Sequence, residues 1–491
     1  MFETLRDANR SYLNLLDGAW VGTTSGSMLE IVSPVDGSLV GRVPAMTRAD
    51  VDQAIESSHR SQPAWAALPI HERAAVLYRA AELLEAHAEE IGQVLTMEIA
   101  KDAHSAVYEV RRTADFLRYT ADAGKNMAGE AIGGDTFPGG SKNKISYVSR
   151  VPLGTVLAIS PFNYPINLSA SKLAPALIGG NAVVLKPASQ GAISALHLAA
   201  VFQAAGLPAG VLNTVTGRGS DIGDYIVTHP GIHFINFTGS TEVGKRIARQ
   251  AGMVPLMLEL GGKDAAIVLA DADLDFAAEN IVAGAYAYAG QRCTAVKRIL
   301  AEDAVADQLV PRLLSRIAAL KTGDPRENAT IVPLINHQAA DYVMALLADA
   351  VAKGAQVLTG GGRQGNLIEP TLVDHVTPEM RLAWEEPFGP VLPILRVQNT
   401  QQAIDIANRS EYGLQSSVFT NQIHAAFAIA NQLEVGTVQI NNKTERGPDH
   451  FPFLGVKASG MGTQGVKYAI EAMTRPKAIV FNLEGHSPDL G

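Results

Sequence analysis

Short strand-forming runs and helical stretches alternate along most of this 491-residue chain, and this alternation limits its fold more than any other feature. Each run is rich in β-branched residues and precedes a longer stretch with helical periodicity. Because parallel strands need a crossover between them, this order predicts parallel sheets covered by helices on both faces. The runs form two groups, one at 155–159, 182–185, 211–215 and 232–237, and one at 265–269, 391–397, 416–419 and 437–440. We therefore expect an α/β fold with two doubly wound parallel-sheet domains.

The Gly-Gly pair at 261 and 262 separates the two groups and marks the expected domain border. Before the first group, an irregular start leads to one long amphipathic helix expected from His71 to Lys101, and a second helix is expected through Phe116. The first domain is expected to span 1–128 and 150–260, and the second 261–470.

The segment 129–149 fits neither domain, because its glycines and its alternating run Ile145–Val148 are typical of a β-hairpin. Isolated hairpins are marginally stable, so a partner is expected. The C-terminal run Ala478–Phe481 is one candidate and another subunit is a second, whereas a surface flap is the simpler alternative. We expect 129–149 and 471–491 to form a small β arm for oligomerisation.

Composition excludes several classes of protein. The net charge of −9 argues against a nucleic-acid partner, which would need a basic surface. No apolar run approaches the roughly 20 residues that cross a bilayer, and the N-terminus lacks the apolar core of a signal peptide. A single cysteine cannot form an intrachain disulfide. We expect a cytoplasmic protein with no membrane partner.

That cysteine, Cys293, lies in the short polar run Gly290–Thr294 between two long apolar stretches. A core cysteine is the alternative, but core cysteines usually have aliphatic neighbours, whereas Gln and Arg precede this one. A second unusual segment, Leu258–Lys263, places Glu259 at the end of an apolar strand just before the Gly-Gly turn. A cysteine nucleophile and a carboxylate base together indicate acyl chemistry.

Ligands of a doubly wound sheet bind at the carboxyl ends of its strands, so the loops at those ends are candidate sites. After the strand at 155–159, Asn163 lies between Pro161 and Pro165, where a fixed amide could stabilise an oxyanion by ~3 kcal/mol. A turn-forming Asn is the alternative. The segments 186–189, 217–220 and 238–244 place Lys, Gly, Ser or Thr where helix N-termini bind anions, which favours a dinucleotide, although helix capping would explain any one of them.

Five segments in this order resemble the signatures of the aldehyde dehydrogenase superfamily, and the resemblance spans nearly the whole chain: 161–165, 237–241, 258–263, 290–294 and 386–390. Within that superfamily, the non-phosphorylating glyceraldehyde-3-phosphate dehydrogenases are the most similar group. The similarity to that group lies in Tyr164, Arg292, 382–386, 440–447 and 465–468.

The resemblance implies a mechanism and a fold of cofactor-binding domain, catalytic domain and oligomerisation arm, in a homo-oligomer that is a dimer or a tetramer. Cys293 would attack the aldehyde, and Asn163 with the Cys293 backbone N–H would hold the oxyanion of the thiohemiacetal. Hydride transfer would leave a thioester, which Glu259 would hydrolyse by activating water. The reaction implied is irreversible oxidation of D-glyceraldehyde 3-phosphate to 3-phospho-D-glycerate, without a metal.

The resemblance also implies the binding residues. The contacts to the phosphorylated aldehyde would be Arg112, Tyr164, Arg292, Thr294 and Arg446. The contacts to the cofactor would be Ser160, Lys186, Ser189, Asp224, Gly239, Ser240, Leu260, Glu386 and Phe388. Many NAD-dependent relatives have a glutamate at the position of Ser189, where a carboxylate would repel a 2′-phosphate, so we expect NADP rather than NAD.

Other functions stay open at this point. One alternative is an aldehyde dehydrogenase for another small aldehyde, such as a semialdehyde or lactaldehyde, in which Arg292 and Arg446 would bind a carboxylate or serve only the fold. A cofactor-free thiol esterase is disfavoured by the glycine turns. A non-catalytic binding protein is disfavoured because Cys293, Glu259 and Asn163 are all present.

Overall fold

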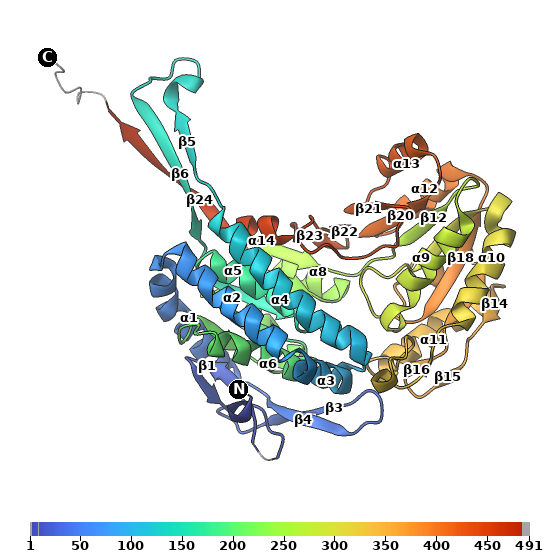
Figure 1. Cartoon of the computed structure of the whole chain (residues 1–491), viewed down its shortest axis with the longest axis horizontal. Helices are drawn as coiled ribbons and strands as arrows, with labels where there is room; N and C mark the ends of the chain where they lie inside the picture. Colours follow the sequence, from blue (N-terminus) through green and yellow to red (C-terminus); the bar gives the residue numbers. More distant parts are fainter. Residues whose placement is uncertain (1, 8, 484–491) are drawn as a thin grey trace.

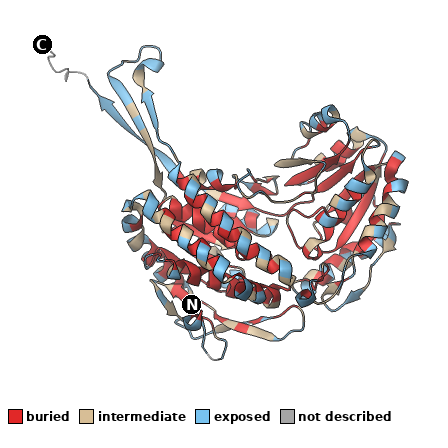
Figure 2. Ribbon diagram, in the orientation of Figure 1, coloured by how far each residue is buried: buried red, intermediate tan, exposed pale blue. Residues whose placement is uncertain are grey.

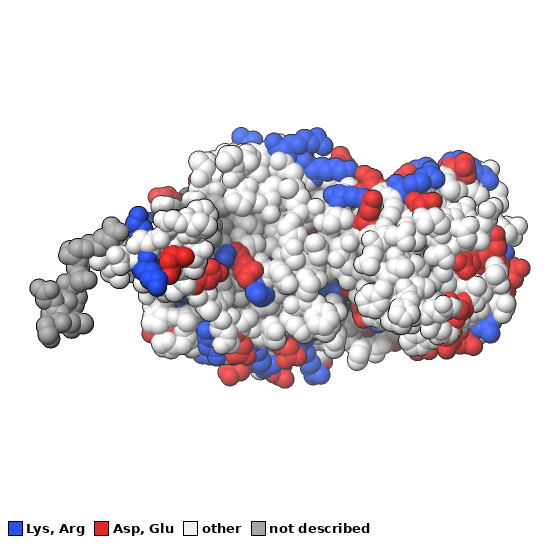
Figure 3. Space-filling model, turned by 90° about the horizontal axis from the view of Figure 1, so that it is seen from above, with Lys and Arg blue, Asp and Glu red and all other residues white. Residues whose placement is uncertain are grey.

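The computed structural model describes residues 2–7 and 9–483 as two α/β lobes and a long projecting arm (Figure 1). The last residues of the expected arm, 484–491, lie outside the described residues. No helix in the described part of the chain is long and apolar enough to span a membrane. On the face drawn in Figure 3, acidic and basic side chains are interspersed.

The first lobe is built on a six-stranded sheet in the order β23-β11-β10-β7-β8-β9. All neighbours are parallel except β23 and β11. The strands are β7 (Thr155–Ser160), β8 (Ala182–Pro187), β9 (Leu212–Thr214), β10 (Phe234–Thr238), β11 (Leu256–Glu259) and β23 (Gly460–Met461). The four runs expected in this part of the chain all form strands.

Helices cover both faces of this sheet, as the burial of successive residues in β7 requires. Val156 and Ala158 pack in one core with α5 (Asn167–Ile178) and α6 (Ala192–Ala204). Leu157, between them, packs in a separate core with α1 (Arg48–Ala67) and α7 (Gly219–Val227). From β7 the strand order runs outward in both directions, so the connections after β7 and β10 leave on opposite faces and open a crevice at the carboxyl edge.

The prediction of one continuous helix from 71 to 101 is wrong, because the structure has two helices there. They are α2 (Ile70–Ala86) and α3 (Ala88–Ile99), and α4 (Ala103–Lys125) follows and extends past Phe116. The chain turns at His87, whose φ and ψ are −109° and 17°. Buried positions keep a helical spacing across the turn, and neither Gly nor Pro marks it, so the pattern carried no sign of the break.

The second lobe has a seven-stranded sheet in the order β14-β17-β18-β13-β12-β20-β21. Its strands are β12 (Ala265–Val268), β13 (Arg298–Glu302), β14 (Gln356–Thr359), β17 (Thr371–Asp374), β18 (Val391–Val397), β20 (Gln415–Phe419) and β21 (Thr437–Ile440). The pattern missed β13, β14 and β17. In β13 the reason is plain: it begins with a charged residue, Arg298, which is nonetheless buried with its guanidinium bonded to the carbonyls of Ala383 (3.3 Å) and Ala407 (3.2 Å).

The arm is a three-stranded sheet in the order β24-β6-β5, formed by β5 (Glu130–Gly133), β6 (Lys144–Pro152) and β24 (Thr474–Asn482). Val148 pairs with Ala478, so the hairpin does pair with the C-terminal run, as predicted. Both sheets of the lobes are buried, whereas the arm is largely exposed (Figure 2).

Four N-terminal strands lie in the part of the chain expected to be irregular: β1 (Asn14–Leu16), β2 (Ala19–Val21), β3 (Met28–Val32) and β4 (Leu39–Pro44). The other helices are α8 (Thr241–Gln250), α9 (Leu274–Tyr286), α10 (Asp303–Ala318), α11 (His337–Ala352), α12 (Thr400–Asn408), α13 (Ile423–Ala430) and α14 (Val466–Ala472). The remaining short strands are β15 (Arg363–Gln364), β16 (Leu367–Ile368), β19 (Tyr412–Gly413) and β22 (Val456–Lys457).

Candidate active site

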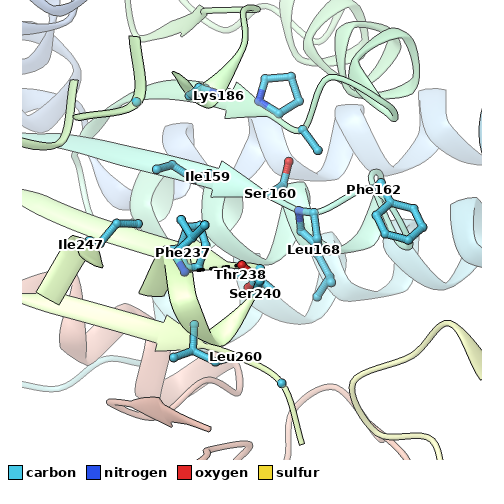
Figure 4. A pocket seen from close by; sticks show the side chains of 18 of the residues that line it. Ile159, Ser160, Phe162, Leu168, Lys186, Phe237, Thr238, Ser240, Ile247 and Leu260 are labelled. Carbon is cyan, nitrogen blue, oxygen red and sulfur yellow. Dashed lines mark hydrogen bonds between the residues drawn. The ribbon is translucent and has the colours of Figure 1, made fainter. Parts of the chain in front are cut away.

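A cavity of about 770 Å³ lies at the carboxyl edge of the first sheet and reaches Cys293 of the second lobe. Figure 4 shows part of its lining, with Lys186 in β8, Ser160 at the end of β7 and Leu260 just after β11. The second lobe contributes Cys293, Glu386 and Phe388. One continuous space therefore joins the expected cofactor residues to the expected nucleophile.

The two lobes present opposite edges of their sheets to this space. The first lobe presents the carboxyl ends of its strands, as expected. In the second lobe Cys293 precedes β13, and Glu386 and Phe388 precede β18, so these residues lie at the amino edge of a parallel sheet. Candidate site residues therefore lie at the carboxyl ends of strands in the first lobe only.

The nucleophile and its expected oxyanion donor lie on loops that touch. The side chain of Asn163 is buried, and its Nδ2 donates to the carbonyl of Gln291 at 3.0 Å, two residues before Cys293. Cys293 is partly exposed. Burial raises the pKa of its thiol to about 11, although the cations Lys297 and Arg446 oppose the rise. The thiol is therefore protonated at neutral pH and needs a change in its surroundings, or a base, to become a thiolate.

Glu259 is a buried carboxyl group at the end of β11. It is only 2% exposed, and neither carboxylate oxygen has a hydrogen-bond partner among the described residues. Burial raises its pKa to about 8, against the opposing charges of Arg446 and Lys172. A carboxyl group that titrates near neutrality is suited to general base catalysis.

Lys172 is a site residue that the sequence analysis missed. It lies in α5, a helix buried along its whole length, and its Nζ donates to Thr238 Oγ1 at 2.7 Å and to the carbonyl of Leu168 at 3.2 Å. Burial, together with the charge of Arg446, lowers its pKa to about 7, although the charges of Glu259 and Cys293 oppose this. A single lysine in an otherwise small and apolar buried helix was the signal available in the sequence.

The expected cofactor residues line the cavity, with one exception. Ser240 caps α8 and accepts from the N–H of Val243 at 3.4 Å, which places the N-terminus of that helix at the cavity. Lys186 donates to the carbonyl of Gly217 at 3.2 Å, and burial lowers its pKa to about 8. Ser189 is not among the lining residues, although its neighbour Ala188 is. The others that line it are Ser160, Asp224, Gly239, Leu260, Glu386 and Phe388.

The donor set fits a dinucleotide. A helix N-terminus and a buried lysine suit phosphates, and the carboxylate of Glu386 suits ribose hydroxyls. Glu386 lies directly over the Gly-Gly turn: its Oε1 accepts from the N–H of Gly262 at 3.2 Å, and a Cβ at Gly261 would lie 2.2 Å from its Oε2. The cavity volume is in the range of cofactor sites. In the described residues no group of three or more His, Cys, Asp or Glu side chains is arranged to hold a metal ion.

The expected phosphate ligands lie outside the cofactor cavity. Arg112 and Arg446 line a separate cavity of about 560 Å³. Arg112 is engaged there by Asp449, at 2.6 Å from Nε and 2.8 Å from Nη2, and it also donates to the carbonyl of Arg446 at 2.7 Å. The Nε of Arg446 lies 3.6 Å from the same Asp449. Nothing in the sequence marked Asp449 as a partner of both arginines.

Of the other three expected substrate residues, Arg292 and Thr294 flank Cys293 in the chain, and Tyr164 follows Asn163. The guanidinium of Arg292 donates to the carbonyl of Gly284, and its Nε is buried without a partner among the described residues. Thr294 is buried, and its carbonyl accepts from Thr444 at 2.9 Å. Tyr164 has the Nζ of Lys101 at 3.5 Å from its ring centroid.

Comparisons with known proteins agree with this geometry. The sequence model of the aldehyde dehydrogenase family matches residues 20–479. An NADP-dependent glyceraldehyde-3-phosphate dehydrogenase of Streptococcus equinus is 58% identical over 96% of this chain and 99% of its own length. An enzyme of the same name from Triticum aestivum is 48% identical over 98% and 97%. The crystal structure of NADP-dependent glyceraldehyde-3-phosphate dehydrogenase from Bacillus halodurans C-125, complexed with NADP, has a TM-score of 0.95 and 52% identity, and the match covers 96% and 99% of the two chains.

Proposed function

Because the chain belongs to the aldehyde dehydrogenase family, we propose that it oxidises D-glyceraldehyde 3-phosphate irreversibly to 3-phospho-D-glycerate, with NADP and water. The observation that carries the proposal is the single cavity that runs from the anion-binding end of the first sheet to Cys293. We assign cofactor binding to 1–128 and 150–260 and catalysis to 261–470, with β23 of the latter joining the first sheet.

The chain's own residues account for both chemical steps. After loss of its proton, the Cys293 sulfur adds as a thiolate to the aldehyde carbon, the carbonyl π bond breaks, and the resulting oxyanion accepts hydrogen bonds from Asn163 Nδ2 and the Cys293 N–H. NADP, when bound, supplies the acceptor for the hydride, and the thiohemiacetal on Cys293 becomes a thioester. Glu259 then takes a proton from water, whose oxygen attacks the thioester carbon and releases the acid and the thiol. The carboxylate of Glu259 supports this role, because neither of its oxygens is engaged in a hydrogen bond with another described residue.

The substrate phosphate would be bound by Arg446, Arg292 and Arg112, with Tyr164 and Thr294 completing the site. The nearness of Arg446 to the reacting groups supports its assignment, since its charge lowers the pKa of both Cys293 and Glu259. Arg112 would reach the phosphate only by sharing or leaving its contacts with Asp449.

The preference for NADP is assigned to the end of β8. Lys186 offers a positive charge, and Ser189, which is half-buried, offers a hydroxyl where a carboxylate would repel a 2′-phosphate. The names of the two relatives and of the solved structure, each NADP-dependent, support this assignment.

We further propose that the arm mediates homo-oligomerisation, as a dimer or a tetramer, and that the protein is cytoplasmic. Large apolar side chains of the arm are exposed, among them Tyr147 (49%), Val480 (63%) and Phe481 (50%). Such side chains in a soluble protein are usually covered by a partner. Sedimentation of the intact chain and of a Val480→Lys variant tests this, and a monomeric intact chain would contradict it.

The rate of NADP reduction with glyceraldehyde 3-phosphate, in the absence of inorganic phosphate, tests the function. Parallel reactions contain NAD in place of NADP and glyceraldehyde in place of its phosphate. We expect rapid formation of NADPH with the phosphorylated substrate only. Equal or higher rates with glyceraldehyde or a semialdehyde would favour another aldehyde dehydrogenase, and no reaction in any mixture would contradict the enzymatic proposal.

A further inference from the structure

Lys297 is a buried lysine that lies between the proposed nucleophile and a carboxylate of the proposed cofactor site. Its side chain is 2% exposed, and the residue lies between the Cys293 loop and β13, which begins at Arg298. Its Nζ donates to the carbonyl oxygen of Cys293 and forms an ion pair with Glu386 Oε1 at 3.1 Å. One ammonium group thus contacts both the loop of the nucleophile and the carboxylate that faces the cofactor cavity.

Burying a lysine is costly unless its charge is paired, so its partners matter. The carboxylate of Glu386 forms the ion pair and is itself fixed by the N–H of Gly262 at 3.2 Å. The carboxyl group of Asp264 lies near enough for the charge of Lys297 to oppose the rise that burial causes in its pKa. The buried lysine nearby in sequence, Lys263, differs: its Nζ has no hydrogen-bond partner in the described part of the chain. Of Lys263 and Lys297, only Lys297 contacts both the Cys293 loop and Glu386.

We propose that Lys297 is a positioning residue that couples Glu386 to Cys293, holding the nucleophile's loop in place and keeping a positive charge beside the thiol. The inference rests on the proposed roles of Cys293 and Glu386. It adds a residue to which neither the motifs nor the chemistry of the two steps assigned a function.

The electrostatics of the thiol agree with this geometry. Burial is the main influence and raises the pKa of Cys293, and Lys297 is the strongest of the charges that lower it. The other charged groups that face the thiol are Arg446, Glu259, Asp264 and Lys172. Glu386 partly neutralises Lys297 through their ion pair. Removing Lys297 and removing the charge of Glu386 should consequently shift the acidity of the thiol in opposite directions.

Alkylation of the cofactor-free, full-length protein by iodoacetamide measures this directly. Cys293 is the only cysteine, so the mass of the intact chain reports one reaction at one site. Below the pKa of the thiol, the rate follows the thiolate fraction. We expect Lys297→Met to react about tenfold more slowly than the unmodified chain, which corresponds to one pKa unit. We expect Glu386→Gln to react about threefold faster, and the double variant to react as slowly as Lys297→Met alone, because Glu386 acts through Lys297.

Lys263→Met is the matched control, since it removes a buried lysine of the same region and should leave the alkylation rate within twofold. Lys297→Arg keeps the charge and should also stay within twofold. Unchanged alkylation of Lys297→Met would overturn the proposal. If Lys297→Met does not fold, the alkylation rate of Glu386→Gln tests the proposal instead. An unchanged alkylation rate of Glu386→Gln would overturn the proposal equally. Alkylation needs no turnover, so this inference and the proposed function can fail separately.

Discussion

Replacement of Glu259 by glutamine removes the proposed base while keeping the size and shape of the side chain. If Glu259 activates water for thioester hydrolysis, steady-state turnover should fall by roughly 10²- to 10⁴-fold, the range for loss of a general base. Formation of the thioester precedes that step, so the first equivalent of NADPH should still appear as a rapid burst. The two outcomes together separate deacylation from the earlier chemistry.

The pH dependence of the unmodified enzyme follows from the same group. Burial raises the pKa of Glu259 to about 8, and the base must be ionised to act. About a tenth of the carboxyl groups are ionised at pH 7 and about nine-tenths at pH 9, so a turnover limited by hydrolysis should rise by nearly tenfold over that interval. Glu259→Gln should lose this pH dependence.

The free energy of unfolding should fall as the pH rises, whereas the turnover rate should increase. The folded-state pKa is raised from 4.5 to about 8, so the folded chain holds this proton more tightly than the unfolded chain. The stability contributed by the protonated carboxyl is complete below pH 4.5 and is lost progressively as the pH rises to about 8. At pH 7 the loss is at most about 3 kcal/mol. Glu259→Gln has no titrating carboxyl group at this position, so its stability should not show this loss as the pH rises.

Thermal unfolding of both proteins between pH 4.5 and pH 9 measures the difference. We expect the melting temperature of Glu259→Gln to exceed that of the unmodified chain by a margin that grows with pH and levels off above pH 8. Glu242, an exposed residue of α8, provides the control variant Glu242→Gln, which should show no such trend. A difference in melting temperature that stays constant from pH 4.5 to pH 9 would refute the claim that burial raises the pKa of Glu259. Loss of the NADPH burst in Glu259→Gln would show that Glu259 does not act in deacylation alone.

Other substitutions test the remaining roles. Cys293→Ser should abolish NADPH formation while leaving NADP binding, followed by fluorescence titration, within twofold; full turnover would contradict the nucleophile. Arg446→Ala should lower kcat/KM for glyceraldehyde 3-phosphate at least tenfold more than kcat/KM for glyceraldehyde, because a charged hydrogen bond to phosphate is worth about 1.5 to 3 kcal/mol, whereas the lost charge near Cys293 and Glu259 affects both substrates alike; equal losses on both substrates would contradict a phosphate site. Ser189→Glu should raise the KM for NADP by about tenfold or more with little change in the KM for NAD, both measured from initial rates. An unchanged ratio of these KM values would show that residues other than Ser189 select the cofactor.

The fold class was predictable because it depends on local pattern. Runs of β-branched residues form strands wherever they are covered on both faces, and eight such runs became strands of the two sheets. The hairpin at 129–149 and its C-terminal partner were likewise legible as alternating residues. Strands with a charged start, such as β13 at Arg298, were missed because tertiary hydrogen bonds, and not local preference, make their burial possible.

The candidate catalytic residues could be proposed from motifs, since a lone cysteine in a polar run and a carboxylate before Gly-Gly are unusual in themselves. The sequence by itself therefore determined the two α/β units and the residue types of the chemistry. Only the tertiary structure decided how these residues are buried and which charges surround them. It buries the carboxyl group of Glu259 near Lys172, pairs Asp449 with Arg112, and places Lys297 between Cys293 and Glu386. A pKa depends on burial and on charges that arrive from distant parts of the chain, and no local pattern encodes those distances.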